Sequence, residues 1–168
     1  FFFVLGMAHG KVFKFVLTGG PCGGKTTSLS HISSHLKSLG FEVYVLPETA
    51  TLLIGSGVQY HGLTREQQLA HESSVIRFQR ASEDAFVHRA RQNDKPTVLL
   101  CDRGVCDERA YMNKDDFNML LDQEQLKLGE LRDRRYDAVY HLVSAAIGAE
   151  KFYTNANNEA RTETVDEA

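Results

Sequence analysis

The sequence predicts an α/β fold, with a parallel sheet covered by helices on both faces. Two observations predict this class. Four apolar runs of strand length alternate along the 168 residues with segments whose apolar residues recur at helical spacing. A glycine-rich turn joins the first apolar run to the first helical segment, as in the βα units of parallel sheets. A hydrophobic content of 42% and a charged content of 24% suit one globular domain of this size.

Four strands are expected, at residues 12–17, 41–46, 97–102 and 138–143. Each is a short run rich in β-branched, aromatic or aliphatic residues, with glycine, proline or polar residues beside it. The third run, TVLLCD, is apolar until its closing carboxylate. Short continuous apolar runs of this kind are typical of buried strands.

Helices are expected between these strands. Residues 26–39 place leucine and isoleucine at helical spacing, and residues 49–54 suit a short helix. Segment 64–92 opens with T-R-E-Q, which resembles a capping box. Residues 105–112 and 114–135 are also helix-prone. The expected apolar face of the longest helix consists of Leu69, Val75, Ile76, Phe78, Phe86 and Val87.

The turn after the first strand reads GGPCGGKT at residues 19–26 and fits G-x-x-x-x-G-K-[ST], the P-loop or Walker A pattern. Glycines allow backbone N–H groups to turn toward phosphate oxygens, because no Cβ intervenes. The lysine brings a positive charge to the β- and γ-phosphates, and the threonine hydroxyl coordinates Mg²⁺. Strand, turn and helix follow in the required order, so the phosphates would lie at a helix N-terminus. The residues expected to bind the nucleotide are Gly20, Pro21, Cys22, Gly23, Gly24, Lys25, Thr26 and Thr27.

Charged residues follow two of the expected strands, at the carboxyl ends that face the ligand crevice of an open α/β sheet. Asp102 closes the third strand in the Walker B position, where a carboxylate helps to hold Mg²⁺ near Thr26. Arg103 follows it, and a planar guanidinium there suits a phosphate clamp better than a surface ion pair. Glu48 follows the second strand as a candidate general base or ligand of a metal-bound water. The structural alternative is a carboxylate favoured by a helix N-terminus.

Charge and cysteine content exclude several classes. The net charge is −3 and no lysine- and arginine-rich block occurs, so nucleic-acid binding is not expected. No run reaches the roughly 18 apolar residues that span a membrane. The apolar opening, residues 1–5, is short and lacks a basic start, so a signal peptide is not expected. The three cysteines form no C-x-x-C pair and indicate reduced thiols, hence a cytoplasmic protein.

Three further patterns are not expected to carry function. Residues 113–116 spell N-K-x-D, the guanine-reading motif of GTPases, but they follow a helical segment instead of a strand. His31 and His35 lie four residues apart with no evident third ligand, so we expect them to face solvent. Cys22 is a candidate reactive thiol near a helix N-terminus, but a small residue tolerated in the loop is the simpler interpretation.

Four segments in this order resemble a known family. FVLTGGPCGGKTT, VLPETAT, LLCDRGVCDERAY and EARTETVDEA are similar to the P-loop domain shared by NadR-type nicotinamide riboside kinases and the TRPL translocation defect protein family. The likeness runs from about residue 11 to the end and is closer to the second family. It implies a P-loop NTPase three-layer sandwich of the kinase-like branch. A more distant likeness is to deoxynucleoside kinases.

The resemblance implies roles for individual residues. In the deoxynucleoside kinases a glutamate after the second strand acts as base, an acid–arginine pair ends the third strand, and an arginine lies in a lid before a helix. This implies Glu48 as base candidate, Asp102 and Arg103 as the pair, and Arg161 as lid arginine. Lys151 belongs either to the same lid or to a disordered tail.

The chain departs from its relatives at the C-terminal end of the matched region. Relatives continue with the rest of a helix, a fifth strand and a loop that often packs on the nucleotide base. At the other end of the chain, residues 1–10 precede the matched region and are expected to be a leader or a cloning remnant. Residues 11–168 are expected to form a P-loop nucleotide-binding domain that is incomplete at its C-terminus and lacks its last strand. No role follows from the resemblance for Glu108 and Arg109.

Two functions remain open from the sequence. The first is Mg²⁺-dependent binding of ATP or GTP, with phosphoryl transfer to a small hydroxyl acceptor if the domain is catalytic. The alternative is a nucleotide-dependent regulatory module with little turnover that binds a protein or a phosphoinositide. The resemblance favours this alternative, because the translocation-defect family looks regulatory, with GTP and phospholipid binding. A kinase requires Glu48 and an acceptor pocket beside it, whereas a switch requires a segment that orders around the γ-phosphate.

Overall fold

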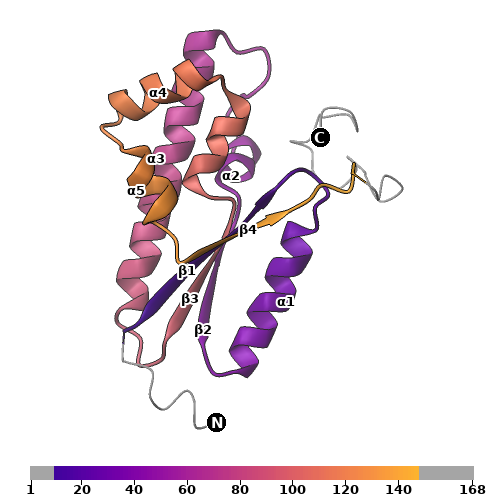
Figure 1. Ribbon diagram of the computed structural model, residues 1–168, viewed down its shortest axis with the longest axis vertical. Coiled ribbons are helices and arrows are strands. Elements are labelled where there is room, and N and C mark those ends of the chain that lie inside the picture. Colours follow the sequence, from indigo (N-terminus) through magenta and orange to yellow (C-terminus); the bar gives the residue numbers. More distant parts are fainter. Residues whose placement is uncertain (1–9, 148–168) are drawn as a thin grey trace.

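Four parallel strands form the sheet at the centre of the computed structural model, which describes residues 10–147 (Figure 1). The strand order is β2–β3–β1–β4, and all four expected strands are confirmed. The register pairs Leu17 of β1 with Asp102 of β3, and Leu46 of β2 with Cys101. All strands run the same way, so their carboxyl ends meet at one edge. The strands are β1 (Val12–Gly19), β2 (Glu42–Leu46), β3 (Thr97–Asp102) and β4 (Ala138–Leu142).

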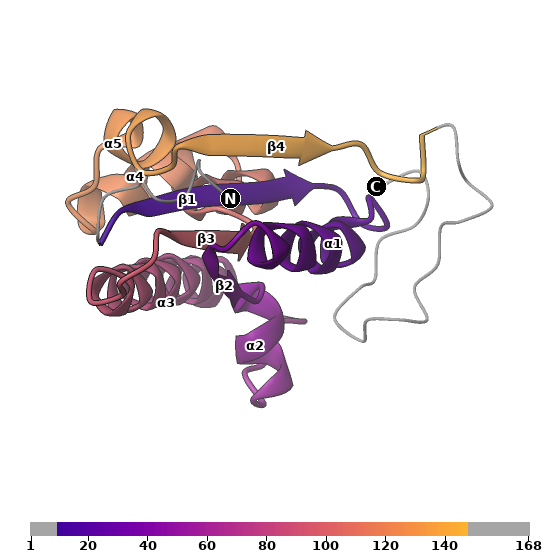
Figure 2. The same cartoon turned by 90° about the horizontal axis from the view of Figure 1, so that it is seen from below.

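Helices cover both faces of this sheet, which confirms the three-layer α/β class (Figure 2). Helix α1 (Lys25–Ser38) packs on one face and α3 (Arg65–Ala90) on the other. Every residue of β3 is buried, as its continuous apolar run predicts. Val98 and Leu100 pack with Leu29 of α1, whereas Leu99 and Cys101 belong to the core beneath α3.

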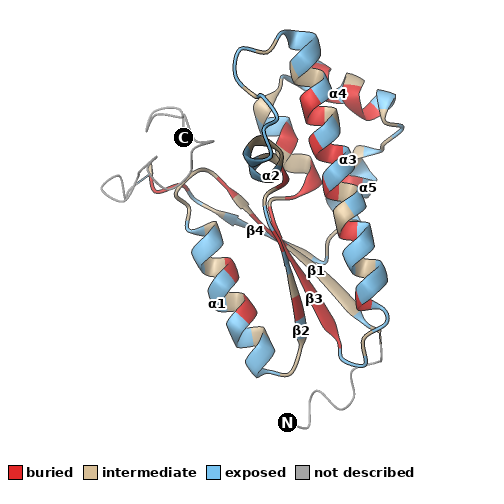
Figure 3. Ribbon diagram, turned by 180° about the vertical axis from the view of Figure 1, so that it is seen from behind, coloured by how far each residue is buried: buried red, intermediate tan, exposed pale blue. Residues whose placement is uncertain are grey.

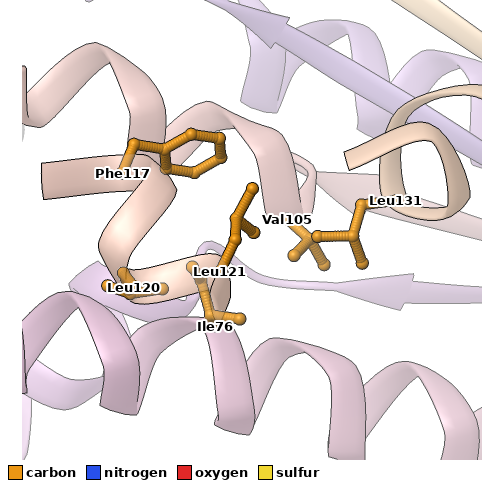
Figure 4. Packing of buried hydrophobic residues seen from close by; sticks show 6 residues of the cluster. All are labelled: Ile76, Val105, Phe117, Leu120, Leu121 and Leu131. Carbon is orange, nitrogen blue, oxygen red and sulfur yellow. The ribbon is translucent and has the colours of Figure 1, made fainter. Parts of the chain in front are cut away.

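A second core lies above the α3 face. Figure 4 shows the side chains that α3, η2, α4 and α5 bring together there. The segment 105–112, expected to be helical, is the 3₁₀ helix η2, and the segment 114–135 divides into two short helices. The remaining helices are α2 (Thr49–Gly55), η2 (Val105–Tyr111), α4 (Lys114–Gln123) and α5 (Leu128–Asp133). The buried members of this core are Ile76, Val105, Phe117, Leu120, Leu121 and Leu131.

The apolar face expected for α3 is wrong in part (Figure 3). Val75 and Ile76 are buried, but Phe78 and Phe86 are 42% and 39% exposed. Phe86 instead packs at the margin against Tyr44, with ring centroids 5.6 Å apart. The inner face of α3 carries polar groups because they meet charged partners from β1, η2 and the segment before β4. The polar residues buried on this helix are His71, Glu72, Gln79 and Glu83.

Glu83 is the centre of this polar interior and is fully buried. Its carboxylate accepts hydrogen bonds from Lys14 Nζ at 2.9 Å, Arg135 Nε at 2.7 Å, Tyr136 Oη at 2.8 Å and Gln79 Nε2 at 3.0 Å. A buried charge is tolerated when cations and donors satisfy it in this way. The network ties the middle of α3 to β1 and to the chain that enters β4.

Candidate functional site

The glycine-rich loop lies at the carboxyl edge of the sheet, between the end of β1 and the start of α1. Gly19 has φ +129°, and a Cβ built on it would lie 1.9 Å from the Leu142 carbonyl oxygen of β4. Only glycine fits there, because both the backbone conformation and the neighbouring strand exclude a side chain. Gly24 also has a positive φ, +78°, and is the N-cap of α1.

The first turn of α1 is arranged to receive an anion. Gly24 has no side chain to cap the helix, so no side-chain oxygen accepts from the first N–H groups. Unsatisfied N–H groups at a helix N-terminus make a site for phosphate. Lys25 Nζ is held over the loop by the carbonyl oxygens of Gly19 and Gly20, both at 2.9 Å. Its charge therefore lies at the loop, and its contact with the phosphates stays a prediction.

A residue that the sequence did not single out fixes the loop from the far side. Ser144, just after β4, donates from its hydroxyl to the carbonyl oxygen of Pro21 at 2.7 Å. A cavity of about 320 Å³ lies between loop residues 22–24 and the segment that starts at Val143. Nothing in the local sequence marks Ser144, because its partner is more than 120 positions away.

Asp102 ends β3 at the same edge. It is 9% exposed, and its Oδ1 has no hydrogen-bond partner within the described residues. Burial, then the nearby Glu48 charge, raises the pKa of Asp102, and the charges of Lys25 and Arg103 only partly offset this. A buried carboxylate oxygen without a partner calls for an explanation, and a metal ion supplies one. This fits the expected Mg²⁺ site.

Thr26, the other residue expected to bind Mg²⁺, lies in the first turn of α1, and its side chain is exposed. Among residues 10–147 no three His, Cys, Asp or Glu side chains gather as a protein-only metal cage. Mg²⁺ in nucleotide sites takes one or two protein ligands and completes its shell with phosphate oxygens and water. Thr26 and Asp102 are therefore a suitable pair for an ion that arrives with a nucleotide.

Glu48 and Arg103, from the ends of β2 and β3, form an ion pair through Glu48 Oε1 and Arg103 Nε. The other Glu48 oxygen accepts from the Thr51 hydroxyl at 2.8 Å. Arg103 lies over the Tyr111 ring, with its guanidinium carbon 5.7 Å from the centroid. Burial lowers the pKa of Arg103, but the charges of Glu48, Tyr111 and Asp107 outweigh it and raise the pKa overall. The guanidinium thus stays charged.

Gln79 joins this ion pair to the interior of α3. Its side-chain oxygen accepts from the Thr49 hydroxyl, next to Glu48. Its amide nitrogen donates to Glu83 Oε1 at 3.0 Å and lies 3.4 Å from the Arg103 carbonyl oxygen. Arg103 has an unusual positive φ of +70°, so its backbone needs such support. Gln79 could not be identified from the sequence, because only the folded chain brings Thr49 of α2 and the Arg103 carbonyl next to its side chain.

A second acid lies beside the phosphate loop. Asp107 of η2 accepts a hydrogen bond from the Thr18 hydroxyl, at the end of β1. Burial raises the pKa of Asp107, and the bond from Thr18 and the charge of Arg103 lower it in part. Asp107 belongs to the LLCDRGVCDERAY segment that resembles the known family, but nothing in the sequence indicated a role for it.

The remaining expectations divide as follows. His31 and His35 are exposed, as expected. The asparagine and aspartate of the N-K-x-D pattern have structural partners: Asn113 caps α4, and Asp116 pairs with Arg65. Arg161 and Lys151 lie outside the described residues. No helix within residues 10–147 combines the length and the apolar character that crossing a membrane requires.

Comparisons with known proteins agree with this geometry. A family model described as an AAA domain matches residues 14–168. Among solved structures, the chain is similar to thymidylate kinase from Ehrlichia chaffeensis, with a TM-score of 0.56 and 17% identity over 79% of this chain and 71% of that one. This likeness concerns the fold alone. The structure of APE1195 matches with a TM-score of 0.35 and 26% identity, over 70% and 59%. The comparison with curated proteins finds no match.

The family match covers far more than half of the chain and includes the glycine-rich loop, β3 and the strands that hold them. The parallel sheet with helices on both faces is consistent with the similarity in fold to the thymidylate kinase structure. The chain therefore belongs to the AAA domain family and has a kinase-like P-loop fold.

Proposed function

We propose that this domain binds a purine nucleoside triphosphate with Mg²⁺ and transfers its γ-phosphoryl group to a hydroxyl of a small molecule. The observation that carries the proposal is the Glu48–Arg103 ion pair at the same sheet edge as the phosphate loop. A nucleotide site alone would need only the loop and Asp102. A carboxylate just after β2 and a partly buried guanidinium just after β3 supply what an acceptor and a transferred phosphoryl group require.

The chain's residues would divide the work by position. The loop from Gly20 to Thr27 would bind the phosphates through its N–H groups and Lys25. Thr26 and Asp102 would hold Mg²⁺, which neutralises phosphate charge when bound. In the transfer, a bond forms between the acceptor oxygen and the γ-phosphorus, and the bond to the β–γ bridging oxygen breaks. The acceptor proton passes to Glu48 or water, and Arg103 faces the developing charge.

One observation favours the alternative, a regulatory module with little turnover. Both oxygens of Glu48 already accept hydrogen bonds, from Arg103 and Thr51, so the carboxylate has less capacity to take a proton. In this alternative the bound ATP or GTP would set affinity for a protein or a phosphoinositide. The resemblance to the translocation-defect family supports this alternative. If the alternative is right, we expect the chain to be more closely related to that family than to the nicotinamide riboside kinases.

Location in the cytoplasm is also proposed. Cys101 and Cys106 form no disulfide within residues 10–147, which suits a reducing compartment. Burial raises the pKa of Cys101 to about 12 and that of Cys106 to about 11, so both thiols resist oxidation.

Calorimetric titration of ATP, GTP and their diphosphates with Mg²⁺ tests the binding step. We expect Lys25→Ala to weaken triphosphate binding at least 100-fold, about 2.7 kcal/mol. Lys37→Ala, an exposed lysine of the same helix, is the control and should leave affinity unchanged. Equal affinities of wild type and Lys25→Ala would contradict the site.

Turnover then separates the two functions. For a kinase, Glu48→Gln should lower the transfer rate at least 100-fold, because it removes the base and the charge that orients Arg103. Triphosphate affinity should stay within about twofold of wild type. Tight nucleotide binding with negligible hydrolysis or transfer in the wild type would instead favour the regulatory module.

A further inference from the structure

A cavity rich in positive charge lies between α3 and α5, on the face of the sheet opposite α1 (Figure 1). Its volume is about 340 Å³, which is at the lower end of the range for small-molecule sites. Of the described residues, six cations and two acids line it, although the whole chain has a net charge of −3. Positive charge is therefore concentrated here in a chain that is acidic as a whole. The six cations are Lys14, Arg80, Arg91, Lys127, Arg134 and Arg135.

This cationic cavity is separate from the candidate nucleotide site. Lys14 is the third residue of β1, whereas the phosphate loop begins at the opposite end of that strand, at Gly19. Five strand residues span about 16 Å. Arg91 is the C-cap of α3 and directly follows the last residue of the helix. Among residues 10–147, none of those expected to bind nucleotide, metal or acceptor lines the cavity, so a ligand here would leave the phosphate loop open.

Two of the six cations are already neutralised by acids. Lys14 and Arg135 both bind the buried Glu83, at 2.9 and 2.7 Å, and Arg135 also pairs with Asp84 at 3.2 Å. The other four take part in no ion pair within the part of the chain that the structure describes. These four are Arg80, Arg91, Lys127 and Arg134.

Arg80 supplies a second, independent observation. Its Nε is buried and has no hydrogen-bond partner among the described residues. Glu124 lies within range of the Arg80 charge, but its carboxylate already accepts from Arg77 at 2.7 Å and from Ser73 at 2.6 Å. Buried N–H groups in native proteins almost always have an acceptor. An anion in the cavity would supply the acceptor that Arg80 lacks.

We propose that this cavity binds a small organic anion with two or three carboxylate groups. A guanidinium presents two parallel N–H donors that match the two oxygens of a carboxylate, so Arg80 and Arg134 would each bind one such group. Three apolar side chains also line the cavity and would contact the carbon skeleton between the carboxylates. They belong to Val87, Leu126 and Leu131. The site goes beyond the proposed function and does not depend on it.

The lining favours carboxylates over phosphates. The phosphate loop of this chain relies on glycines and backbone N–H groups, whereas no glycine of the described chain lines the cavity. Asp84 and Glu130 do line it and would repel a phosphate ester, which concentrates almost two negative charges on one group near neutral pH. Carboxylates carry one charge each and are spread along a carbon skeleton. They can therefore contact the arginines at a distance from these two acids.

Calorimetric titration of the full chain at low ionic strength tests the inference. The probes are tricarballylate, succinate and acetate, which carry three, two and one carboxylates, and inorganic pyrophosphate. We expect tricarballylate to bind with a Kd below about 1 mM, succinate more weakly, and acetate at least tenfold more weakly than tricarballylate. Absence of tricarballylate binding up to about 10 mM would overturn the inference.

The same titrations with Lys25→Ala separate the cavity from the phosphate loop. Because Lys25 lies at the loop, this variant should bind tricarballylate within about twofold of wild type. Pyrophosphate should bind this variant more weakly than tricarballylate does. If Lys25→Ala abolished tricarballylate binding, the anion would lie at the phosphate loop. If pyrophosphate bound the variant more tightly, the carboxylate class would be wrong.

Variants of the lining locate the binding. Arg80→Gln and Arg134→Gln should each weaken tricarballylate at least tenfold, and Arg134 is exposed, so its replacement should leave the melting temperature unchanged. Glu130→Gln removes a lining acid and should act in the opposite direction, tightening binding at least twofold. Arg89→Gln is the matched control, because Arg89 is an exposed arginine of α3 outside the lining. Equal effects of Arg89→Gln and Arg134→Gln would reduce the site to diffuse surface charge and overturn the inference.

This inference and the proposed nucleotide site can fail separately. Arg134→Gln should bind triphosphate as wild type does, because Arg134 lines only the cationic cavity. A chain that binds no triphosphate but binds tricarballylate through Arg80 and Arg134 would contradict the proposed function alone. A chain that binds triphosphate but not tricarballylate would contradict this inference alone.

Discussion

The two halves of the candidate site share one edge of the sheet but are built differently. The phosphate side is one continuous stretch, from Gly19 to Thr27, and it uses backbone conformation, a helix N-terminus and one lysine. The acceptor side, the surroundings of the Glu48–Arg103 ion pair, collects single side chains from just after β2, from α2 and α3, and from just after β3, and all of them are at least partly buried. Glu48 and Arg103, for example, are 55 positions apart in sequence.

This difference explains why the two sides depend differently on the rest of the protein. The phosphate side has few buried polar side chains, so Lys25 can be changed with little effect on folding. On the acceptor side, Gln79 and Glu83 satisfy charged groups from several elements. Removing one partner there leaves other polar groups buried without hydrogen bonds, which lowers the free energy of unfolding. Function and stability are therefore separable on the first side and coupled on the second.

The largest expected effect comes from Glu83→Ala. Its removal leaves Lys14 without its carboxylate, Arg135 with only the exposed Asp84, and Tyr136 without its acceptor. We expect a loss of about 3–5 kcal/mol in the free energy of unfolding, the range for breaking a buried ion pair. Urea denaturation measures it.

Two variants sharpen this prediction. Asp84→Ala changes the next residue, which also pairs with Arg135 but is 65% exposed at its side chain. It should cost less than about 1 kcal/mol, as exposed ion pairs do. Lys25→Ala should leave the unfolding free energy unchanged to within about 0.5 kcal/mol. Equal losses for Glu83→Ala and Lys25→Ala would remove the distinction between the two sides.

The next effect concerns Gln79→Met, which keeps the volume of the side chain but not its hydrogen bonds. Because Gln79 holds Thr49 and the Arg103 carbonyl, the variant should misplace the Glu48–Arg103 pair. We expect a loss of about tenfold in transfer rate, about 1.4 kcal/mol, with triphosphate affinity unchanged. Single-turnover transfer and calorimetry measure the two quantities. A variant that loses triphosphate affinity as well would show that Gln79 acts through the whole fold.

What could be predicted from the sequence follows the same division. The four strands, the loop and Asp102 could be predicted because each is a local pattern: an apolar run, a glycine motif, or a carboxylate that ends a strand. The capping box at Thr64 is also local, and the structure confirms it. The partners of Gln79 and Ser144 could not be predicted, because each bond crosses from one element to a distant one.

The face of α3 shows the physical reason for the errors. Helical spacing assigns apolar residues to the core on the assumption that the interior is apolar. Here the interior contains Lys14 and Arg135, which require polar partners, so α3 turns Gln79 and Glu83 inward. Phe78 is consequently placed toward solvent. The sequence of α3 alone cannot show that charged residues from distant parts of the chain, such as Lys14 of β1, will pack against its inner face.

The smallest expected effect tests this account of α3 directly. Phe78→Ala removes a large apolar side chain that is 42% exposed, so it should cost only about 1 kcal/mol of unfolding free energy. Ile76→Ala removes a smaller side chain from the same helix, but one that is fully buried against η2 and α4, so it should cost about 2–5 kcal/mol. Urea denaturation of the two variants gives the comparison. If Phe78→Ala proved as costly as Ile76→Ala, Phe78 would belong to the core that helical spacing predicts, and the inward placement of Gln79 and Glu83 would be wrong.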